Sequence, residues 1–401
     1  MKICIVTTSF PHWPGDGHAP FIYEAARAIQ RKGHQVRVIA MHVPGTKTHE
    51  WWDGIEVIRP RYLPEKWEVL QKEGGGLPEV WKKHKLARLA LLPFMLVHII
   101  TVARYARDCD IVHANWTLSG MAAWLSQPVH RKPYVVTVQG SDIYQIHRYP
   151  LIIKYTQMVL SNSSAVVALS RSLSEQLISF GLDKSKITLI PNGVDIIKFA
   201  PGPVTREHYI LFVGSLIKRK GVEDLLYAFS EVVHNDEELN LVIAGEGPLY
   251  KDLIKLGEAL GIIDRINLLG KVTQDQVAYL MRHAKLFILP SLEEGLGVVL
   301  LEALASGTPC IASSVGGILD IVNQENGILV EPANPKAFAN AILHLLSDVN
   351  RWRIMSINAR SMIEKNYSWN IIGDMINDLY NNVFYRVSKN YSIIEEKTMD
   401  E

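Results

Sequence analysis

The chain has 401 residues, more than one hydrophobic core usually holds, so its length predicts two domains. With 48 % apolar and 21 % charged residues, the composition is that of a soluble globular protein and excludes a disordered or fibrous one. The 3 cysteines, Cys4, Cys109 and Cys310, lie far apart, which excludes a disulfide framework and indicates a reducing compartment. The apolar run in MKICIVTTSF is too short for a signal peptide and predicts a first strand, so we expect a cytoplasmic protein.

Charge is unevenly distributed along the chain, although the formal net charge is only +1. Residues 1–198 carry a formal charge of +9, and residues 199–401 carry −8. A basic first half predicts an anionic partner. That partner is either a phosphorylated acceptor or a membrane surface. In the second case the protein would be peripherally associated with the inner face of the membrane. Lysines that are simply solvated would give the same charge, so the sequence leaves these interpretations open.

Strands alternate with helices along the first half, which predicts a parallel sheet covered on both faces. Two helices have clear glycine stops: Phe21–Lys32, which Gly33 closes, and Ser172–Phe180, which Gly181 closes. The apolar runs predicted to form strands are Lys2–Thr7, Gln35–Ala40, Ile55–Arg59, Ile111–Ala114, Tyr134–Val138, Ala165–Ala168 and Ile187–Ile190.

The segment 82–107 is an apolar stretch with basic ends. Arg88, Pro93 and His98 interrupt its middle, so it is a poor transmembrane span. Two interpretations remain. It is either the buried crossover helix that precedes the strand Ile111–Ala114, or an interfacial helix that docks on anionic lipid.

A polar stretch, Asn192 to Asp195, followed by Pro201-Gly202-Pro203, predicts a hinge between the two halves. We expect one domain over residues 1–198 and a second over 199–368. The tail from Ser368 to Phe384 has a helical pattern, and the last dozen residues are expected to fray. The second half repeats the alternating pattern, with strands predicted at Tyr209–Val213, Asn240–Ala244, Ile266–Leu268, Leu286–Leu289 and Pro309–Ala312.

The most informative motif is Pro290 to Gly317, PSLEEGLGVVLLEALASGTPCIASSVGG. A Gly-Leu-Gly turn opens a helix predicted over Val298 to Ala305, and free N–H groups at such a helix start bind anions well. Glu294 precedes the turn, and Glu302 lies one turn inside the helix. A carboxylate accepts several hydrogen bonds and suits vicinal hydroxyls such as those of a ribose. Together these features predict a nucleotide-diphosphate pocket.

This segment resembles the signature of the retaining glycosyltransferases of family 4. The resemblance implies the GT-B fold, in which two doubly wound, Rossmann-like domains face a central cleft and a C-terminal helix, here residues 369–401, crosses back to the first domain. It implies that Glu294 contacts the donor sugar and that Glu302 holds the ribose. It also implies donor contacts from the turn between them, at Gly295, Leu296, Gly297 and Val298.

Three consecutive cations, Lys218, Arg219 and Lys220, stand where the strand Tyr209–Val213 turns toward a helix. Cations placed there would stabilise the charge that develops on a departing diphosphate. Lys220 matches the lysine of the family, whereas Ser215 stands where the family usually has arginine. Either Lys218 or Arg219 compensates for that arginine, or the phosphate clamp is weaker. The resemblance also places Gly247 at the donor-side loop and Val272 at the nucleobase site.

In the first half, loops that follow predicted strands supply the remaining candidates. The resemblance places Gln139 where relatives usually have histidine, near the donor sugar, and an amide there can bond but cannot take a proton. Gly15 and Gly17 would let the backbone approach the sugar–phosphate or the acceptor. We expect the acceptor near Asp142, Trp13, Trp116 and His113, although a lone histidine and most tryptophans more often serve packing.

The resemblance implies a retaining enzyme that moves a sugar from a UDP- or GDP-linked nucleotide-diphospho-sugar to a hydroxyl of a glycan, glycolipid or small molecule. We expect no cofactor, no nucleic-acid partner and no metal requirement. Two other interpretations stay open. One is a GT-B epimerase or phosphorylase that acts on nucleotide-sugars. The other is a nucleotide-sugar-binding protein without catalysis, which the departures at Ser215 and Gln139 would allow.

Overall fold

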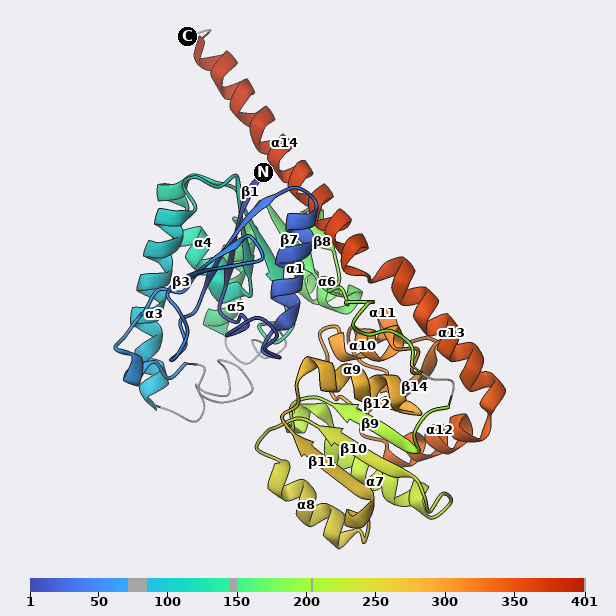
Figure 1. Cartoon of the computed structure of the whole chain (residues 1–401). Helices are drawn as coiled ribbons and strands as arrows, with labels where there is room; N and C mark the ends of the chain where they lie inside the picture. The colour runs from blue at the N-terminus through green and yellow to red at the C-terminus, as the bar shows by residue number, and fades with distance from the viewer. Residues whose placement is uncertain (71–84, 144–149, 203–204, 400–401) are drawn as a thin grey trace. The chain divides into compact units, whose positions relative to one another are not determined.

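The computed structural model describes residues 1–70, 85–143, 150–202 and 205–399 (Figure 1). The chain folds into two compact units. Unit 1 comprises Met1–Pro14, His18–Pro191 and Asn370–Glu401, and unit 2 comprises Gly15–Gly17 and Asn192–Trp369. Each unit contains one sheet with helices packed against it, which confirms the predicted α/β class.

Unit 1 is built on an eight-stranded sheet with the order β3-β4-β2-β1-β5-β6-β7-β8. All neighbouring strands are parallel except β3, which pairs antiparallel with β4. The chain leaves β1 toward β2 on one side and later returns to place β5 on the other, so the topological switch lies at β1 and β5. The strands are β1 (Lys2–Thr7), β2 (Gln35–Ala40), β3 (His49–Trp52), β4 (Ile55–Ile58), β5 (Ile111–Asn115), β6 (Tyr134–Val138), β7 (Ala165–Ala168) and β8 (Ile187–Leu189).

In the described part of unit 1, five helices connect these strands, and the C-terminal helix α14 (Trp369–Met399) packs beside them. Where we expected frayed terminal residues, α14 continues to Met399. It packs on unit 1 through Lys32, whose Nζ lies 2.6 Å from the Asp374 carboxylate, and through His34, whose Nε2 lies 2.9 Å from Asn377 Oδ1. The other helices are α1 (Pro20–Arg31), α3 (Lys85–Tyr105), α4 (Thr117–His130), α5 (Pro150–Ser161) and α6 (Arg171–Ser179).

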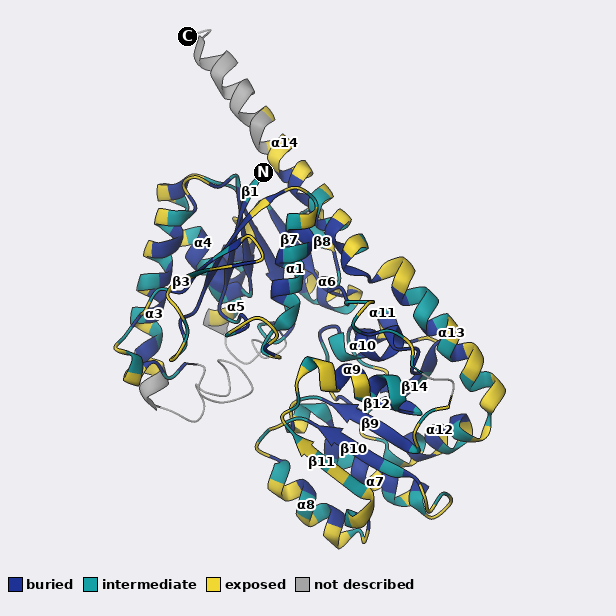
Figure 2. Ribbon diagram, in the orientation of Figure 1, coloured by how far each residue is buried: buried dark blue, intermediate teal, exposed yellow. Residues whose placement is uncertain are grey.

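Unit 2 contains a fully parallel six-stranded sheet with the order β11-β10-β9-β12-β13-β14. The central strands β9 and β12 are almost completely buried, as Figure 2 shows in dark blue. The strands are β9 (Tyr209–Val213), β10 (Asn240–Ala244), β11 (Ile266–Gly270), β12 (Leu286–Leu289), β13 (Cys310–Ser313) and β14 (Gly327–Val330). The helices are α7 (Val222–Val233), α8 (Tyr250–Ala259), α9 (Gln274–His283), α10 (Val298–Ala305), α11 (Ile318–Ile321), α12 (Pro335–Ser347) and α13 (Val349–Asn366).

Within unit 2, the segment that enters it lies beside the segment that leaves it. Val194 forms a parallel bridge with Ser368, and the Val194 N–H donates to the Tyr367 carbonyl at 2.8 Å. Gly193 packs so closely on the Trp369 ring that a Cβ at position 193 would lie 2.6 Å from it. The segment predicted as a hinge is therefore bonded to the start of the C-terminal helix.

Candidate functional site

The motif predicted from the sequence lies at the topological switch of the unit 2 sheet. The chain runs from β9 outward to β10 and then returns to place β12 on the other side of β9. Loops beyond the carboxyl ends of strands at such a switch leave a crevice in which ligands bind. The basic turn follows β9, and the segment from Pro290 to Gly297 follows β12.

The turn before α10 brings free N–H groups to this end of the sheet. Gly297 is the residue before the helix and has φ of 89°, a left-handed conformation that favours glycine. Behind it, Gly317 lies so close to this turn that a Cβ there would be 2.2 Å from the Gly295 carbonyl oxygen. The Gly317 N–H also donates to the Glu294 carbonyl at 3.1 Å. The loop after β13 thus holds the Gly-Leu-Gly turn in place through backbone contacts.

The basic turn forms the 3-10 segment η4 (Lys218–Lys220) and joins the loop after β12. The Leu292 N–H donates to the Arg219 carbonyl at 2.8 Å. Gly221, with φ of 63°, packs against Pro290 so closely that a Cβ there would lie 2.0 Å from the Pro290 carbonyl oxygen. The two loops are therefore one assembly, and neither backbone can move without the other.

This assembly pairs Lys220 with Glu294. The Lys220 Nζ donates to Glu294 Oε2, and both side chains are mostly buried. Ser291 Oγ also approaches the same oxygen, at 3.4 Å. Burial raises the pKa of Glu294, but the charges of Lys220 and Arg219 outweigh it and hold this pKa below its ordinary value. Glu294 is thus ionised at neutral pH, and Lys218 is exposed on the same turn.

Glu302 is the second acid of the motif and has a different environment. It lies inside α10 and is buried, and within the described residues its carboxyl group has no hydrogen-bond partner. Burial raises its pKa to about 8, although Lys198 opposes the shift. A carboxyl group that is buried without a partner is costly unless a ligand satisfies it. Glu302 is therefore a candidate for binding hydroxyl groups of a ligand.

Two arginines hold the opposite end of α10. Arg206 donates through Nη2 to the carbonyls of Ser306 at 3.1 Å and Gly307 at 3.2 Å. Arg360, from α13, donates through Nη1 to the Ala305 carbonyl at 2.9 Å and to the Phe199 carbonyl at 2.9 Å. Cations at a helix C-terminus complement its dipole and satisfy its last carbonyls. These two arginines could not be predicted from the sequence, because nothing in their local pattern marks them.

The loop after β10 packs against the basic turn. A Cβ on Gly247 would lie 2.3 Å from the Leu216 carbonyl oxygen, and one on Gly245 would lie 1.9 Å from the Gly214 carbonyl oxygen. These glycines therefore serve loop packing in this structure. Val272 follows β11 beside them and is partly exposed.

In unit 1, several predicted residues form one hydrogen-bonded cluster beyond β5 and β6. The Gln139 amide donates to Asn115 Oδ1 at 3.2 Å, and the Gln139 N–H donates to Asp142 Oδ1 at 3.0 Å. Asp142 Oδ2 accepts from the Thr117 N–H at 2.9 Å, at the start of α4. Desolvation raises the pKa of Asp142 to about 6 despite these backbone bonds. Trp116 joins the cluster through its Nε1, 3.4 Å from Ser141 Oγ.

The other predicted residues of the first half have different surroundings. Both ring nitrogens of His113 are used inside unit 1, at 2.6 Å from Tyr380 Oη and 2.7 Å from Thr137 Oγ1. This packing role for His113 removes it from the acceptor residues we propose. Trp13 is 59 % exposed beside the His12 ring. A Cβ on Gly15 or Gly17 would meet no atom within 4 Å, so both glycines are open.

The sequence contains one Asp-x-Asp tripeptide, Asp108-Cys109-Asp110, of the kind that holds a metal in some sugar transferases. It precedes β5 and lies at the amino end of the sheet. Its carboxylates are already bonded: Asp108 accepts from Arg37 Nη1 at 2.6 Å, and Asp110 accepts from the Lys2 N–H at 2.7 Å. No cluster of metal-ligating side chains is found among the described residues.

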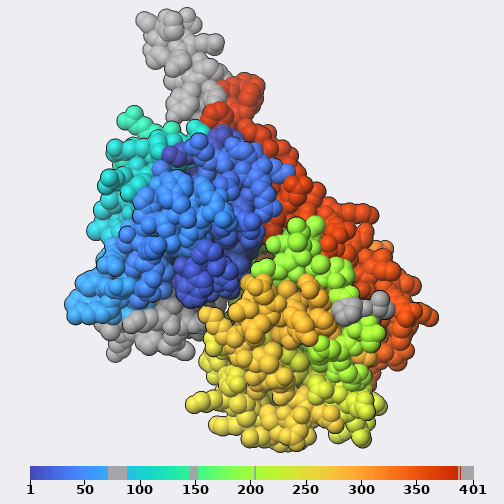
Figure 3. Space-filling view, in the orientation of Figure 1, coloured from blue at the N-terminus to red at the C-terminus, as the bar shows by residue number. Residues whose placement is uncertain are grey.

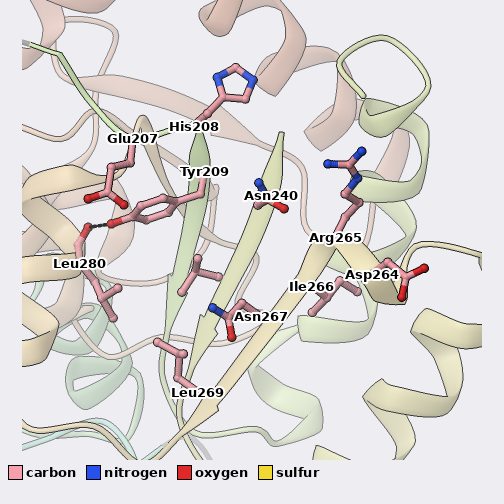
Figure 4. A pocket seen from close by; sticks show the side chains of 11 residues that line it. Glu207, His208, Tyr209, Asn240, Asp264, Arg265, Ile266, Asn267, Leu269 and Leu280 are labelled. Carbon is pink, nitrogen blue, oxygen red and sulfur yellow. Dashed lines mark hydrogen bonds between the residues drawn. The ribbon is translucent and has the colours of Figure 1, made fainter. Parts of the chain in front are cut away.

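A groove of about 550 Å³ lies elsewhere in unit 2, and Figure 4 shows its lining. Tyr209, Asn240 and Asn267 belong to the first residues of β9, β10 and β11, and the Tyr209 hydroxyl donates to the Leu280 carbonyl at 2.7 Å. The groove is therefore at the amino ends of the strands, away from the loops that form the candidate site.

Solved structures share this fold over nearly the whole chain. Sucrose-phosphate synthase from Thermosynechococcus elongatus matches with a TM-score of 0.79 and 22 % identity over 96 % of this chain and 100 % of that chain. Anabaena HepE, solved in complex with UDP-glucose, matches with a TM-score of 0.73 and 19 % identity over 95 % of this chain and 100 % of that chain. Together with the two parallel sheets, these matches define the GT-B fold and confirm the predicted fold class.

Sequence comparisons give the family. The model described as Glycosyltransferase Family 4 matches residues 15–198, and the model described as Glycosyl transferases group 1 matches residues 194–362. A glycosyltransferase of Methanocaldococcus jannaschii is 30 % identical over 94 % of this chain and 97 % of its own length. N-acetyl-alpha-D-glucosaminyl L-malate synthase of Bacillus anthracis is 28 % identical over 96 % of this chain and 98 % of its own length. The chain belongs to the family 4 glycosyltransferases, which confirms the resemblance and makes it a transferase of the EC 2.4 class.

Proposed function

We propose that this protein is a retaining glycosyltransferase that moves a sugar from a nucleotide-diphospho-sugar to a hydroxyl acceptor without a bound metal. The observation that carries the proposal is the pairing of Lys220 with the ionised Glu294 at the turn that opens α10. A cation and free N–H groups at the turn before α10 can bind and stabilise a diphosphate leaving group. The solved HepE complex contains UDP-glucose, which supports a nucleotide-sugar donor for this chain as well.

The roles follow from the surroundings of each residue. Lys220, Arg219 and the N–H groups that follow Gly295 would stabilise the departing diphosphate. The Glu294 carboxylate, held by Lys220, would orient hydroxyls of the donor sugar, and Glu302 would accept hydrogen bonds from the ribose. Leu296, Gly297 and Val298 would line the phosphates. Gly247 and Val272 would lie near the nucleotide, UDP or GDP, whose base backbone groups would recognise.

For unit 1 we propose the acceptor site and part of the donor-sugar site. Gln139 would bond the donor sugar, and Asp142, Trp116 and Trp13 would contact the acceptor. Gly15 and Gly17, which belong to unit 2, would let the backbone approach the sugar–phosphate or the acceptor. The Gln139 amide cannot take a proton, which supports front-face retention, with the departing phosphate oxygen receiving the acceptor's proton. We also propose that the two domains close on the substrates about the region of Val194. We propose a cytoplasmic location.

Transfer from UDP- and GDP-sugars to a panel of hydroxyl acceptors tests these roles. We expect Glu294→Gln and Lys220→Ala each to lower kcat by on the order of a hundredfold. The chain offers a matched control in an exposed neighbour, Glu293→Gln, which should keep nearly full activity. NMR determines the anomeric configuration of the product and so tests retention. Assays with a chelator test whether transfer requires a metal.

Four results would overturn the proposal. Undiminished transfer by both the Glu294 and the Lys220 variant would exclude the roles proposed for these residues. A product with inverted anomeric configuration would exclude retention. Binding of a nucleotide-sugar in a thermal-shift screen without turnover on any acceptor would favour a binding protein, and interconversion of the donor alone would favour an epimerase.

A further inference from the structure

The helix α3 carries an apolar stripe that the protein does not bury. In the described part of the chain it is the one helix long and apolar enough to cross a membrane, yet only 33 % of Arg88–Tyr105 is buried. Leu89, Leu92, Leu96 and Ile100 recur at helical spacing and are all exposed, with Leu92 at 74 %. A crossover helix covered by its own domain would bury such residues. Of the two interpretations that the sequence left open, the buried crossover helix therefore does not account for this face.

The two helices that follow extend this surface. α4 packs beside α3, and α5 packs beside α4. α4 exposes Leu125 and Val129, and α5 exposes Ile152 and Met158. We call the exposed residues of α3, α4 and α5 the basic apolar face. Part of it is visible in Figure 3, where the cyan residues of α3 lie on the surface of unit 1, and Figure 2 marks exposed turns along α3 in yellow.

The charged side chains that α3, α4 and α5 themselves contribute to the basic apolar face are all basic. The sequences of α3, α4 and α5 contain no aspartate and no glutamate. Exposed cations flank the apolar residues: Arg104 on α3, Arg131 after α4, and Lys154 on α5. The nearest acid after α3, Asp108, is bonded to Lys2 and Arg37. A large apolar surface rimmed by charge of one sign marks an interaction site.

We propose that the basic apolar face docks on the surface of an anionic lipid bilayer. Its leucines and isoleucines would enter the boundary between headgroups and acyl chains, while the arginines and Lys154 would pair with lipid phosphates. A second copy of the chain is disfavoured as the partner, because a symmetric contact would bring like charges together. The helix would lie on the membrane rather than span it, because its other side, with Phe94, His98 and Val102, belongs to the core of unit 1.

Co-sedimentation with vesicles tests this inference without reference to sugar transfer. The full chain is mixed with vesicles of phosphatidylcholine and phosphatidylglycerol, or of phosphatidylcholine alone. We expect binding to the anionic vesicles, little binding to the neutral ones, and weakening at high salt. Leu92→Ser combined with Leu96→Ser should lower the vesicle partition coefficient at least about tenfold. Tyr227→Ser is the control, an exposed ring on the helix α7, whose first turn is acidic.

A charge variant separates electrostatic from apolar binding. Arg104→Gln combined with Lys154→Gln should weaken binding to anionic vesicles and flatten its salt dependence. Circular dichroism and melting temperature check that each variant is folded. Failure of the full chain to bind anionic vesicles would overturn the proposal, as would unchanged binding by the leucine variant. A mass in light scattering that falls from dimer to monomer in the leucine variant would show instead that this face joins two copies.

Discussion

Different contacts hold together the loops beyond the strands in the two units. In unit 2 the contacts are between backbone atoms: Gly221 lies against Pro290, and Gly317 lies against Gly295. In unit 1, side chains bond the loops together, as Gln139 does with Asn115 and Asp142 does with the start of α4. The first kind of assembly tolerates no added Cβ at its glycines. The second can change its side-chain chemistry while the backbone stays in place.

This difference explains where a sequence is informative. Backbone assemblies need glycine at fixed positions, and glycine with positive φ is easily recognised between a strand and a helix. A side-chain assembly leaves no such marker, so Asn115 and Thr117 were found only in the structure. We therefore expect substitutions at the glycines of unit 2 to act on folding, and substitutions in the cluster of unit 1 to act on the choice of acceptor.

The largest effect should come from Gly221→Ala. An alanine there must adopt φ near 63° and place its Cβ 2.0 Å from the Pro290 carbonyl oxygen, so the loop has to shift. We expect a loss of about 4 kcal/mol in the free energy of unfolding of unit 2, measured by urea denaturation. Gly33→Ala is the control in unit 1, because φ there is 85° but no atom lies within 4 Å of the added Cβ. It should cost only about 1 kcal/mol, and equal losses at both positions would refute the backbone argument.

Glu302 should make the stability of unit 2 depend on pH. Its pKa is about 8 in the folded chain and near 4.5 when unfolded, so the unfolded state loses its proton first as pH rises. Stability should therefore fall between pH 4.5 and pH 8 by a few kcal/mol, and remain level above that window. Glu302→Gln should remove this fall. Unfolding midpoints measured across the window provide the check, and an unchanged slope in the variant would contradict it.

The same group should couple donor binding to proton release. If the carboxylate binds ribose hydroxyls, the ligand favours the ionised form, and affinity for a nucleoside diphosphate should rise as pH approaches 8. Isothermal calorimetry in two buffers of different ionisation enthalpy measures the released proton. Glu302→Gln should bind more weakly and release none, whereas equal proton release by the variant would exclude Glu302 as its source.

Most elements of both sheets were predictable, because nearly continuous apolar runs mark buried parallel strands. The bounds of β1, β2, β6, β9, β10, β12 and α10 agree with those expected from the sequence. The hairpin strand β3 was missed, although its Asp53-Gly54 turn, with φ of 48° and 81°, is a strong hairpin signal. The arginines that bind the end of α10 come from distant segments, and only tertiary structure brings them there. The sequence could not decide between a buried and an interfacial α3, because the apolar pattern of a helix does not say what covers it.

Arg360→Met tests one of these distant contacts. The guanidinium of Arg360 donates to carbonyls at the end of α10 and in the segment that enters unit 2. Methionine keeps most of the volume but leaves these carbonyls unsatisfied, so we expect a loss of about 2 kcal/mol in the free energy of unfolding. Arg353→Met on the exposed side of the same helix is the control and should change stability little. A loss of the same size in both variants would show that helix propensity, not the carbonyl contacts, is responsible.

The smallest effect, and one of opposite sign, is expected at His98 in unit 1. This side chain is fully buried against Phe94, and among the described residues neither ring nitrogen has a hydrogen-bond partner. Burial lowers its pKa to about 4, so the unfolded state takes up a proton first as pH falls from 6.5, and stability is lost down to about pH 4. His98→Phe should raise the free energy of unfolding by about 1 kcal/mol at neutral pH and remove that part of the acid sensitivity. Thermal unfolding at pH 7 and pH 5 measures both effects. A variant less stable than the wild type at pH 7 would mean that the ring has a partner and that α3 is held in unit 1 by more than apolar packing.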